Sequence, residues 1–541
     1  MPKKNKIKET KYIFVLGGVM SGLGKGIAAS SIGYLLKQAG VRVNIMKLDP
    51  YLNVDPGTMN PYQHGEVFVL DDGSETDLDL GHYERFIDVN MTKDNNATSG
   101  QIYSKVLERE RKGEYLGETV QVIPHVTDEI KDRIRALNIP KKYDVIICEV
   151  GGTVGDIESL PFMEAIRQLS LEVGYHNHML VHVTLLPFVK ASGELKSKPT
   201  QHSVMKLREI GLAPDMILCR SEHPIDQSVR DKIALFCNVR SDHVIEGRDV
   251  SSIYEVPLAM HEQNAGQLIK ERLKIEKTPH LGSLKRFISN YNNPNHDVTI
   301  AMCGKYTELI DSYKSVMEAF VHAGVENNSR VSVKWIQTDR IKNNKTAKKA
   351  FSDVNGILIL PGFGSRGAEG KIRSSKYARE NKIPFLGICL GLQCAVIDFA
   401  RNVTGLKNAN STEFDKKTKY PVIDLMESQK AVKIKGGTMR LGAYDCEIKP
   451  GTRAYAAYRK KKISERHRHR YEVNNRYRNR LEKSGLIFSG INSDLGVVET
   501  IEIKGHPWFV AGQFHPELKS RVNRAHPLFR EFIKASVKYT P

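Results

Sequence analysis

A glycine-rich loop near the start of the chain constrains the fold more than any other feature. The loop covers residues 17–26 and reads GGVMSGLGKG, between an apolar run at 12–16 and a segment from Ile27 whose apolar spacing fits a helix. Strand, loop and helix in this order predict a phosphate-binding loop. Glycines let backbone N–H groups approach phosphate oxygens, and the helix N-terminus adds partial positive charge. We expect a parallel α/β sheet, with Lys25 reaching the terminal phosphates of a nucleotide.

The loop departs from the usual pattern, in which Ser or Thr follows the lysine. Here Gly26 follows Lys25, so the hydroxyl that normally binds Mg²⁺ is missing and the metal needs another ligand. On the local sequence alone, a glycine-rich turn with a surface lysine remains an alternative.

Length and composition limit the domain number, the partners and the location that we expect. A chain of 541 residues predicts more than one domain, and its net charge of +19 suggests polyanionic partners without choosing among them. Seven cysteines without a CxxC pattern argue against a disulfide framework or a zinc ribbon, which favours a cytoplasmic location. We expect no membrane span, because no apolar run approaches about 18 residues. The basic start of the chain is interpreted as a tail before the first strand.

Charged residues end two further apolar runs of the first half. Lys47 and Asp49 end the run that begins at Val41, and Glu149 lies near the end of the run at 143–150. Open α/β sheets bind ligands at the carboxyl ends of their strands. Glu149 therefore predicts a Walker-B-like carboxylate that supplies what Gly26 cannot.

Two other polar stretches are candidates for ligand binding. The acidic cluster at 71–79 offers hard oxygen ligands for Mg²⁺, although such a cluster is more often a solvated acidic loop: Asp71, Asp72, Glu75, Asp77 and Asp79. The basic stretch at 190–202 contains Pro199 and lacks helical periodicity, which favours a loop for substrate phosphates over a solvated face.

A second domain follows a change in sequence character. Residues 276–297 are polar and rich in turn residues, and a new apolar strand begins at Val298. We expect a first domain at 1–275, a linker at 276–297 and a second α/β domain at 298–541.

A candidate nucleophile stands in the second domain. Gly387-Ile-Cys-Leu-Gly391 follows an apolar strand and precedes a helix, which is the cysteine form of a nucleophile elbow. Cys389 needs a base and an acid that orients it. His515 and Glu517 offer both, because two residues apart on an extended segment they face the same side. Cys394 is interpreted as a core residue.

Long strings of this chain resemble the CTP synthase family over essentially all 541 residues. They include residues 47–59, 63–69, 75–85, 151–158 and 193–202 in the first half and 408–414, 436–442 and 465–475 in the second. The resemblance implies a P-loop-like, dethiobiotin-synthetase-like synthetase (amidoligase) domain followed by a class I glutamine amidotransferase domain. It also implies ATP-dependent amination of UTP to CTP through 4-phosphorylated UTP, with ammonia from glutamine.

The resemblance also assigns residues. Phosphoryl transfer would use Lys25 and Lys47, and Mg²⁺ would bind Asp79 and Glu149. ATP would bind Gly22, Leu23, Gly24, Lys25, Gly26, Ile27, Asp79, Arg248, Asp249 and Val250. UTP and CTP would bind Ser21, Asp156, Ile157, Glu158, Lys196, Ser197, Lys198, Pro199, Thr200, Gln201 and Lys232. Glutamine would bind Gly362, Leu390, Gly391, Leu392, Gln393, Glu413 and Arg470, with an oxyanion hole from the N–H groups of Gly362 and Leu390.

Regulation and assembly are further expectations from the family: activation by GTP, feedback inhibition by CTP and a homotetramer. Neither nucleic acid nor membrane is an expected partner. The family usually has Pro-Gly-Gly-Phe-Gly at its oxyanion loop. Aligned on Phe363, this chain has Pro361 in place of the first glycine, and proline lacks an N–H. We expect glutamine hydrolysis to survive this change.

Three alternatives remain open from the sequence. The first is another amidotransferase-coupled synthetase. The second is a DNA-partitioning ATPase or nucleic-acid-binding module, because the chain combines a variant phosphate loop with a high positive charge. The third is a structural, filament-forming role beside catalysis.

Overall fold

The computed structural model describes residues 9–56, 59, 65–139, 142–305, 310–426 and 439–541. It divides into two compact units, residues 1–55 with 79–288 and residues 56–78 with 289–541. The segment 56–78 thus groups with the second unit, whereas the domain boundaries predicted above assign it to the first. The predicted basic tail before residue 9, and parts of the family strings at 47–59, 63–69 and 436–442, lie outside the described residues.

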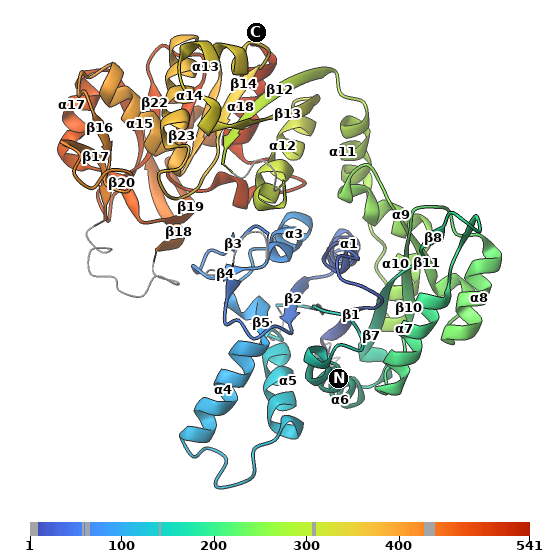
Figure 1. Ribbon diagram of the computed structural model, residues 1–541. Helices are drawn as coiled ribbons and strands as arrows, with labels where there is room; N and C mark the ends of the chain where they lie inside the picture. The colour runs from blue at the N-terminus through green and yellow to red at the C-terminus, as the bar shows by residue number, and fades with distance from the viewer. Residues whose placement is uncertain (1–8, 57–58, 60–64, 140–141, 306–309, 427–438) are drawn as a thin grey trace, which may run out of the picture. The chain divides into compact units, whose positions relative to one another are not determined.

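The first unit is built on a seven-stranded sheet in the order β11-β10-β7-β1-β6-β2-β5 (Figure 1). All its neighbouring strands pair in parallel. The strands are β1 (Lys11–Gly17), β2 (Val43–Asp49), β5 (Asn96–Thr98), β6 (Val145–Val150), β7 (His178–Leu185), β10 (Met216–Ser221) and β11 (Val244–Arg248). The apolar runs predicted at 12–16, 41–48 and 143–150 form β1, β2 and β6, which are almost entirely buried. Continuous apolar strands are expected where helices cover both faces of a parallel sheet.

Most helices of this unit connect these strands, and the last three follow β11. They are α1 (Lys25–Gln38), α3 (Leu78–Ile87), α4 (Ser99–Arg111), α5 (Thr127–Ala136), α6 (Leu160–Val173), α7 (Lys198–Glu209), α8 (Gln227–Cys237), α9 (Val256–Glu262), α10 (Ala265–Leu273) and α11 (Gly282–Asn292). Helix α11 lies inside the stretch predicted to be a linker. Its buried side chains Leu284 and Phe287, three residues apart, give it an apolar side that the turn-rich flanks concealed.

The second unit is built on a nine-stranded mixed sheet in the order β13-β12-β14-β15-β23-β22-β21-β18-β19. The first five strands of this order pair in parallel and the rest antiparallel. They are β12 (His296–Gly304), β13 (Ser329–Gln337), β14 (Gly356–Ile359), β15 (Phe385–Ile388), β18 (Arg440–Ile448), β19 (Lys462–His469), β21 (Leu486–Asn492), β22 (Val497–Ile503) and β23 (Phe509–Gly512). A small sheet adds β16 (Ala409–Ser411), β17 (Tyr420–Leu425) and β20 (Tyr471–Val473).

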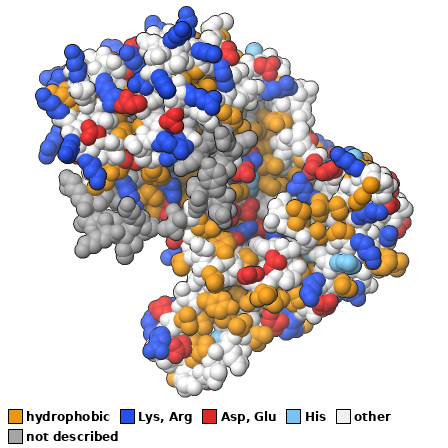
Figure 2. Space-filling view, in the orientation of Figure 1, with side chains coloured by type: hydrophobic (Ala, Val, Ile, Leu, Met, Phe, Trp, Pro, Cys, Tyr) orange, Lys and Arg blue, Asp and Glu red, His pale blue; other side chains and the backbone are white. Residues whose placement is uncertain are grey.

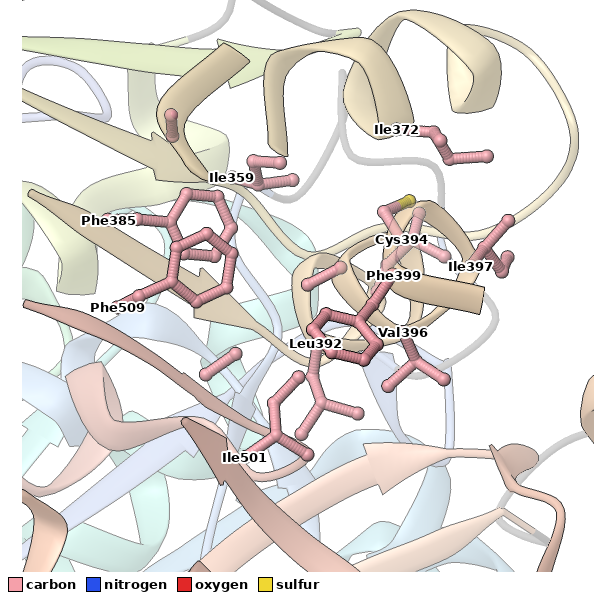
Figure 3. Packing of buried hydrophobic residues seen from close by; sticks show 14 of the residues in the cluster. Ile359, Ile372, Phe385, Leu392, Cys394, Val396, Ile397, Phe399, Ile501 and Phe509 are labelled. Carbon is pink, nitrogen blue, oxygen red and sulfur yellow. The ribbon is translucent and has the colours of Figure 1, made fainter. Parts of the chain in front are cut away.

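The core of the second unit supports its central strands and the helix that follows β15. Its helices are α12 (Lys314–Glu326), α13 (Asn344–Phe351), α14 (Ala368–Glu380), α15 (Leu390–Asn402), α16 (Arg453–Tyr458), α17 (Arg478–Lys483) and α18 (Pro527–Val537). Phe385 stacks on Phe509 from the neighbouring strand, as Figure 3 shows. The centroids of the two rings are 4.1 Å apart. In the same cluster, Leu392 and Phe399 of α15 pack beside these strands. This packing fixes the junction between β15 and α15.

None of the helices in the described residues combines the length and the apolar character needed to cross a membrane.

Candidate functional site

The parallel sheet of the first unit brings the sequence-predicted nucleotide residues to one edge. Gly17, Asp49 and Val150 end strands β1, β2 and β6, and Arg248 ends β11. Strand β1 lies in the middle of the sheet, between β6 and β7. The glycine-rich loop therefore leaves the sheet at its centre, where an open α/β sheet binds its ligand.

The loop itself has the backbone that its glycines allow. Gly22 and Gly24 adopt positive φ angles of 75° and 82°, and Gly24 caps α1. Lys25 folds back as the first residue of α1, and its Nζ donates to the Gly152 carbonyl at 2.7 Å. Burial lowers the pKa of Lys25, and the nearby Glu149 opposes that shift.

Lysine and carboxylate groups form a buried cluster beside this loop. Lys47 Nζ lies 2.6 Å from Asp79 Oδ2 and 2.8 Å from Glu149 Oε1, and Tyr83 donates to the other oxygen of Glu149. Burial would lower the pKa of Lys47, but these two carboxylates raise it well above its usual value. Burial raises the pKa of Asp49 to about 6, against the attraction of Lys47. The cluster thus holds opposite charges side by side at the ends of β2 and β6 and the start of α3.

The unusual glycine after Lys25 has a structural reason. A β carbon on Gly26 would lie 2.1 Å from Asp79 Oδ1, so a serine or threonine does not fit without a shift. The carboxylate occupies the side of the loop where the missing hydroxyl would stand. Mg²⁺ is usually held by one or two carboxylates together with substrate phosphates, so Asp79 and Glu149 are a suitable donor set.

The basic stretch at 190–202 is partly helical, which corrects the sequence expectation of a loop. Helix α7 begins at Lys198, with Pro199 in its first turn, a position where proline favours a helix. Gln201 Nε2 donates to Ser197 Oγ at 3.0 Å, and Thr200 is buried. Lys196 precedes the helix and forms an ion pair with Glu194.

The other residues assigned to nucleotides lie in exposed positions after the strands. Asp156 accepts a hydrogen bond from the Thr153 N–H at 2.8 Å, and the side chain of Ile157 is 81% exposed. Ser21, Glu158 and, on α8, Lys232 are also exposed. Asp249, just beyond β11, forms an ion pair of 2.5 Å with Arg220 at the end of β10.

The second unit contains the elbow that the sequence predicts. Cys389 stands between β15 and α15 with φ 52° and ψ −101°, a strained conformation for a residue other than glycine. A β carbon on Gly391 would lie 2.6 Å from the Ile359 carbonyl oxygen, and one on Gly387 would lie 2.9 Å from the Ala511 side chain. Both neighbours must therefore be glycine for the turn to pack.

His515 and Glu517 meet, but not on an extended segment as the sequence suggested. His515 caps a short 3₁₀ turn over Pro516–Lys519, and its Nδ1 donates to Glu517 Oε1 at 2.8 Å. Burial alone would lower the pKa of His515, whereas Glu517 and the Cys389 thiol raise it, to about 10. Glu517 therefore favours the protonated imidazole.

A cavity of about 440 Å³ joins these groups. Cys389, His515 and Glu517 line it together with Lys305, Pro361, Gly362, Phe363, Arg468 and Arg470. The segment 56–78, which sequence reasoning did not connect with this site, also lines it through Met59, Gly65, Glu66, Val67 and Val69. Glu66 secures the segment by accepting from the Ser315 N–H at 3.0 Å and from its hydroxyl.

Ion pairs hold the same segment and correct the interpretation of the acidic cluster. Asp71 lies 2.6 Å from Arg466, and Glu75 lies 2.7 Å from Arg468, so these two carboxylates are engaged within the second unit. Asp79 of the same cluster instead pairs with Lys47. The pairs also engage part of the basic stretch at 459–480, although Figure 2 shows many other Lys and Arg side chains on the surface of the second unit.

The residues assigned to glutamine surround the loop at 361–364. Glu413 Oε1 accepts from the Gly364 N–H at 2.6 Å, and burial raises the pKa of this carboxyl group. Lys305 donates to the Phe363 carbonyl at 2.7 Å. Leu390, Gly391, Leu392 and Gln393 form the buried first turn of α15.

Comparisons with known proteins match both halves of the chain. Residues 11–275 match the family model described as "CTP synthase N-terminus", and residues 308–535 match "Glutamine amidotransferase class-I". The chain is 58% identical to a CTP synthase of Caldanaerobacter subterraneus over 97% of its own length and 98% of that protein. It is 55% identical to a CTP synthase of Methanocaldococcus jannaschii over 98% and 99%. A structure titled "Trypanosoma brucei CTPS - glutaminase domain with bound acivicin" is 35% identical over 45% of this chain and 95% of that one, with a TM-score of 0.43.

Proposed function

The chain belongs to the CTP synthase family and is a ligase of that type with a glutamine amidotransferase domain, and from this premise we propose how its residues convert UTP, ATP and glutamine into CTP, ADP, phosphate and glutamate. The observation that carries the proposal is that one chain contains two complete sets of reactive groups. One is the buried lysine–carboxylate cluster at the phosphate loop, and the other is the cavity that joins Cys389, His515 and Glu517.

Glutamine hydrolysis takes place in the cavity of the second unit. His515 accepts the thiol proton of Cys389, and the sulfur attacks the side-chain amide of glutamine. The proton passes to the leaving nitrogen, which departs as ammonia, and water releases glutamate from the thioester. Glu517 supports this step because it stabilises the imidazolium that forms. The N–H groups of Gly362 and Leu390 stabilise the oxyanion, and Arg470 and Glu413 hold the charged end of glutamine.

Amination of UTP takes place at the carboxyl edge of the parallel sheet. ATP phosphorylates O4 of UTP, and ammonia then displaces that phosphate. Lys25 and Lys47 stabilise the transferred phosphoryl group, since such reactions depend mainly on positioning and charge neutralisation. Asp79 and Glu149 would hold Mg²⁺, which neutralises charge on the phosphates of ATP. The stretch Arg248–Val250 lies on the adenine side.

The remaining assignments complete the substrate sites. Ser21, the stretch 196–201 and Lys232 bind UTP phosphates, CTP overlaps that phosphate site, and residues 156–158 contact the CTP base. The stretch 196–201 fits this role because the N-terminus of α7 favours negative charge. GTP activates glutamine use, CTP inhibits the enzyme, and the protein acts as a cytoplasmic homotetramer.

One assay tests the proposal. CTP formation from UTP, ATP and Mg²⁺ is measured with either glutamine or ammonium as the nitrogen source, with and without GTP. We expect CTP from both sources and stimulation by GTP with glutamine. CTP from ammonium alone would contradict the glutaminase assignment, and no CTP from either source would contradict the whole proposal.

A further inference from the structure

Helix α14 carries a lysine that is buried in the second unit. The side chain of Lys371 is only 2% exposed, and its Nζ donates to the Leu360 carbonyl at 2.8 Å. Within the part of the chain that the structure describes, no carboxylate forms an ion pair with it. An ammonium group buried without a carboxylate is unfavourable for stability, so this position invites a functional explanation.

The carbonyl that Lys371 holds belongs to the corner before the oxyanion loop. Leu360 follows strand β14, and its own N–H donates to the Cys303 carbonyl at 3.1 Å. Pro361 comes next and cannot donate a backbone hydrogen bond. The bond from Lys371 therefore attaches this corner to α14, just before Gly362.

The charge of Lys371 also lies close to Gly362. Nζ is 3.6 Å from the position that a β carbon would take on that glycine, and the Leu390 side chain is 3.8 Å from the same position. Burial lowers the pKa of Lys371, and the Cys394, Cys303 and Cys389 thiols oppose the shift. In a buried environment, charge beside a developing oxyanion acts more strongly than in water.

We infer that Lys371 is a positioning residue for glutamine hydrolysis. Its ammonium group holds the Leu360 carbonyl, so that the N–H of Gly362 faces the oxyanion formed on Cys389, and its positive charge supports that oxyanion from behind the loop. This role offsets the N–H that Pro361 lacks. The inference rests on the proposed function.

The test compares Lys371→Met and Lys371→Arg with a matched control. Lys376→Met changes a half-exposed lysine of the same helix, which pairs only loosely with Glu380 at 3.9 Å. The measurements are kcat and KM for glutamine hydrolysis, and CTP formation with ammonium. Loss of a direct oxyanion donor lowers kcat by roughly 10²–10³, so an indirect one should lower it by about tenfold or more. We expect this fall in Lys371→Met with KM for glutamine nearly unchanged, partial recovery in Lys371→Arg, and unchanged ammonium-dependent synthesis in all three variants.

Different results overturn different claims. A Lys371→Met enzyme with the parent kcat overturns the positioning role alone. Loss of ammonium-dependent synthesis together with glutaminase overturns it as well, because it identifies Lys371 as a residue of general stability. Absence of glutamine hydrolysis in the unaltered protein overturns the proposed function, and this inference with it.

Discussion

The phosphate-loop site and the cysteine site are built in different ways. In the first unit, Lys47 is buried against Asp79 and Glu149, so each charge is balanced by a neighbour. In the second unit, the main device is backbone geometry, because Cys389 holds a strained turn that glycines on both sides make possible. A site for phosphate transfer needs charge held in place, whereas a site for covalent attack needs one atom presented at a fixed angle.

The comparison predicts that a substitution at one site leaves the activity of the other site unchanged. The largest effect is expected for Cys389→Ala, which removes the attacking atom. Glutamine-dependent CTP formation should fall by about 10⁴ or more, because loss of a nucleophile costs rates of this order. Ammonium-dependent formation should stay at the parent level.

Cys394 provides the control for this experiment. It is buried in α15, five residues after Cys389, and burial raises the pKa of its thiol to about 12. Cys394→Ala should keep glutaminase activity. If Cys389→Ala also lost ammonium-dependent synthesis, the two sites would not be independent.

Charge balance at the phosphate loop predicts the second effect. Lys47→Met removes the cation between Asp79 and Glu149, so CTP formation should fall by about 10²–10³ with either nitrogen source. Glutaminase activity without nucleotides should be retained. The ratio of the two activities, measured on one preparation, checks the prediction, and equal losses in both would contradict it.

A smaller effect is expected from a change of packing at the phosphate-loop site. Gly26→Ser restores the usual hydroxyl of the phosphate loop but places a side chain against Asp79. We expect lower activity and a loss of stability of about 1–3 kcal/mol, as for other overpacked positions. Denaturant unfolding and the CTP assay check it, with Gly282→Ser as a control at a position that has open space and no positive φ. Equal or higher activity in Gly26→Ser would show that the loop accepts the usual pattern.

The sequence predicted the strands that precede both loops because these are local patterns. A run of apolar residues before Gly17 and Cys389 is enough to predict each strand and turn. The sequence could not predict that Asp71 and Glu75 form ion pairs with Arg466 and Arg468, almost 400 residues away. Such pairing depends on tertiary contacts that leave no periodic signal.

Other differences between the sequence prediction and the structure also lack a signal in the local sequence. His515 and Glu517 were expected to meet on an extended segment, but a 3₁₀ turn that Pro516 begins brings them together instead. The short spacing allows both geometries, so the sequence predicted the pair without the backbone. Lys371 carried no motif at all, and only burial and its bond to Leu360 distinguish it from other lysines.

The smallest effect concerns the pH dependence of stability, and it tests whether the second site also uses charge. In the folded protein, Glu517 and the Cys389 thiol raise the pKa of His515 from its ordinary value of 6.5 to about 10, against the effect of burial. The folded state therefore binds more protons than the unfolded state between these values. The stability from this pair is fully present below about pH 6.5 and is lost as the pH rises through about 10.

We expect the unfolding free energy of the unaltered protein to fall by about 1 kcal/mol per pH unit more than that of His515→Gln between pH 7 and 9. Urea unfolding of both proteins across this range measures the difference. Identical slopes would mean that Glu517 orients His515 without storing charge there, so the second site would depend on geometry alone. If the unfolding free energy of the unaltered protein falls more steeply with pH, a buried ion pair accompanies the strained cysteine. The second site would then use charge as well as backbone geometry, and the two sites would differ less.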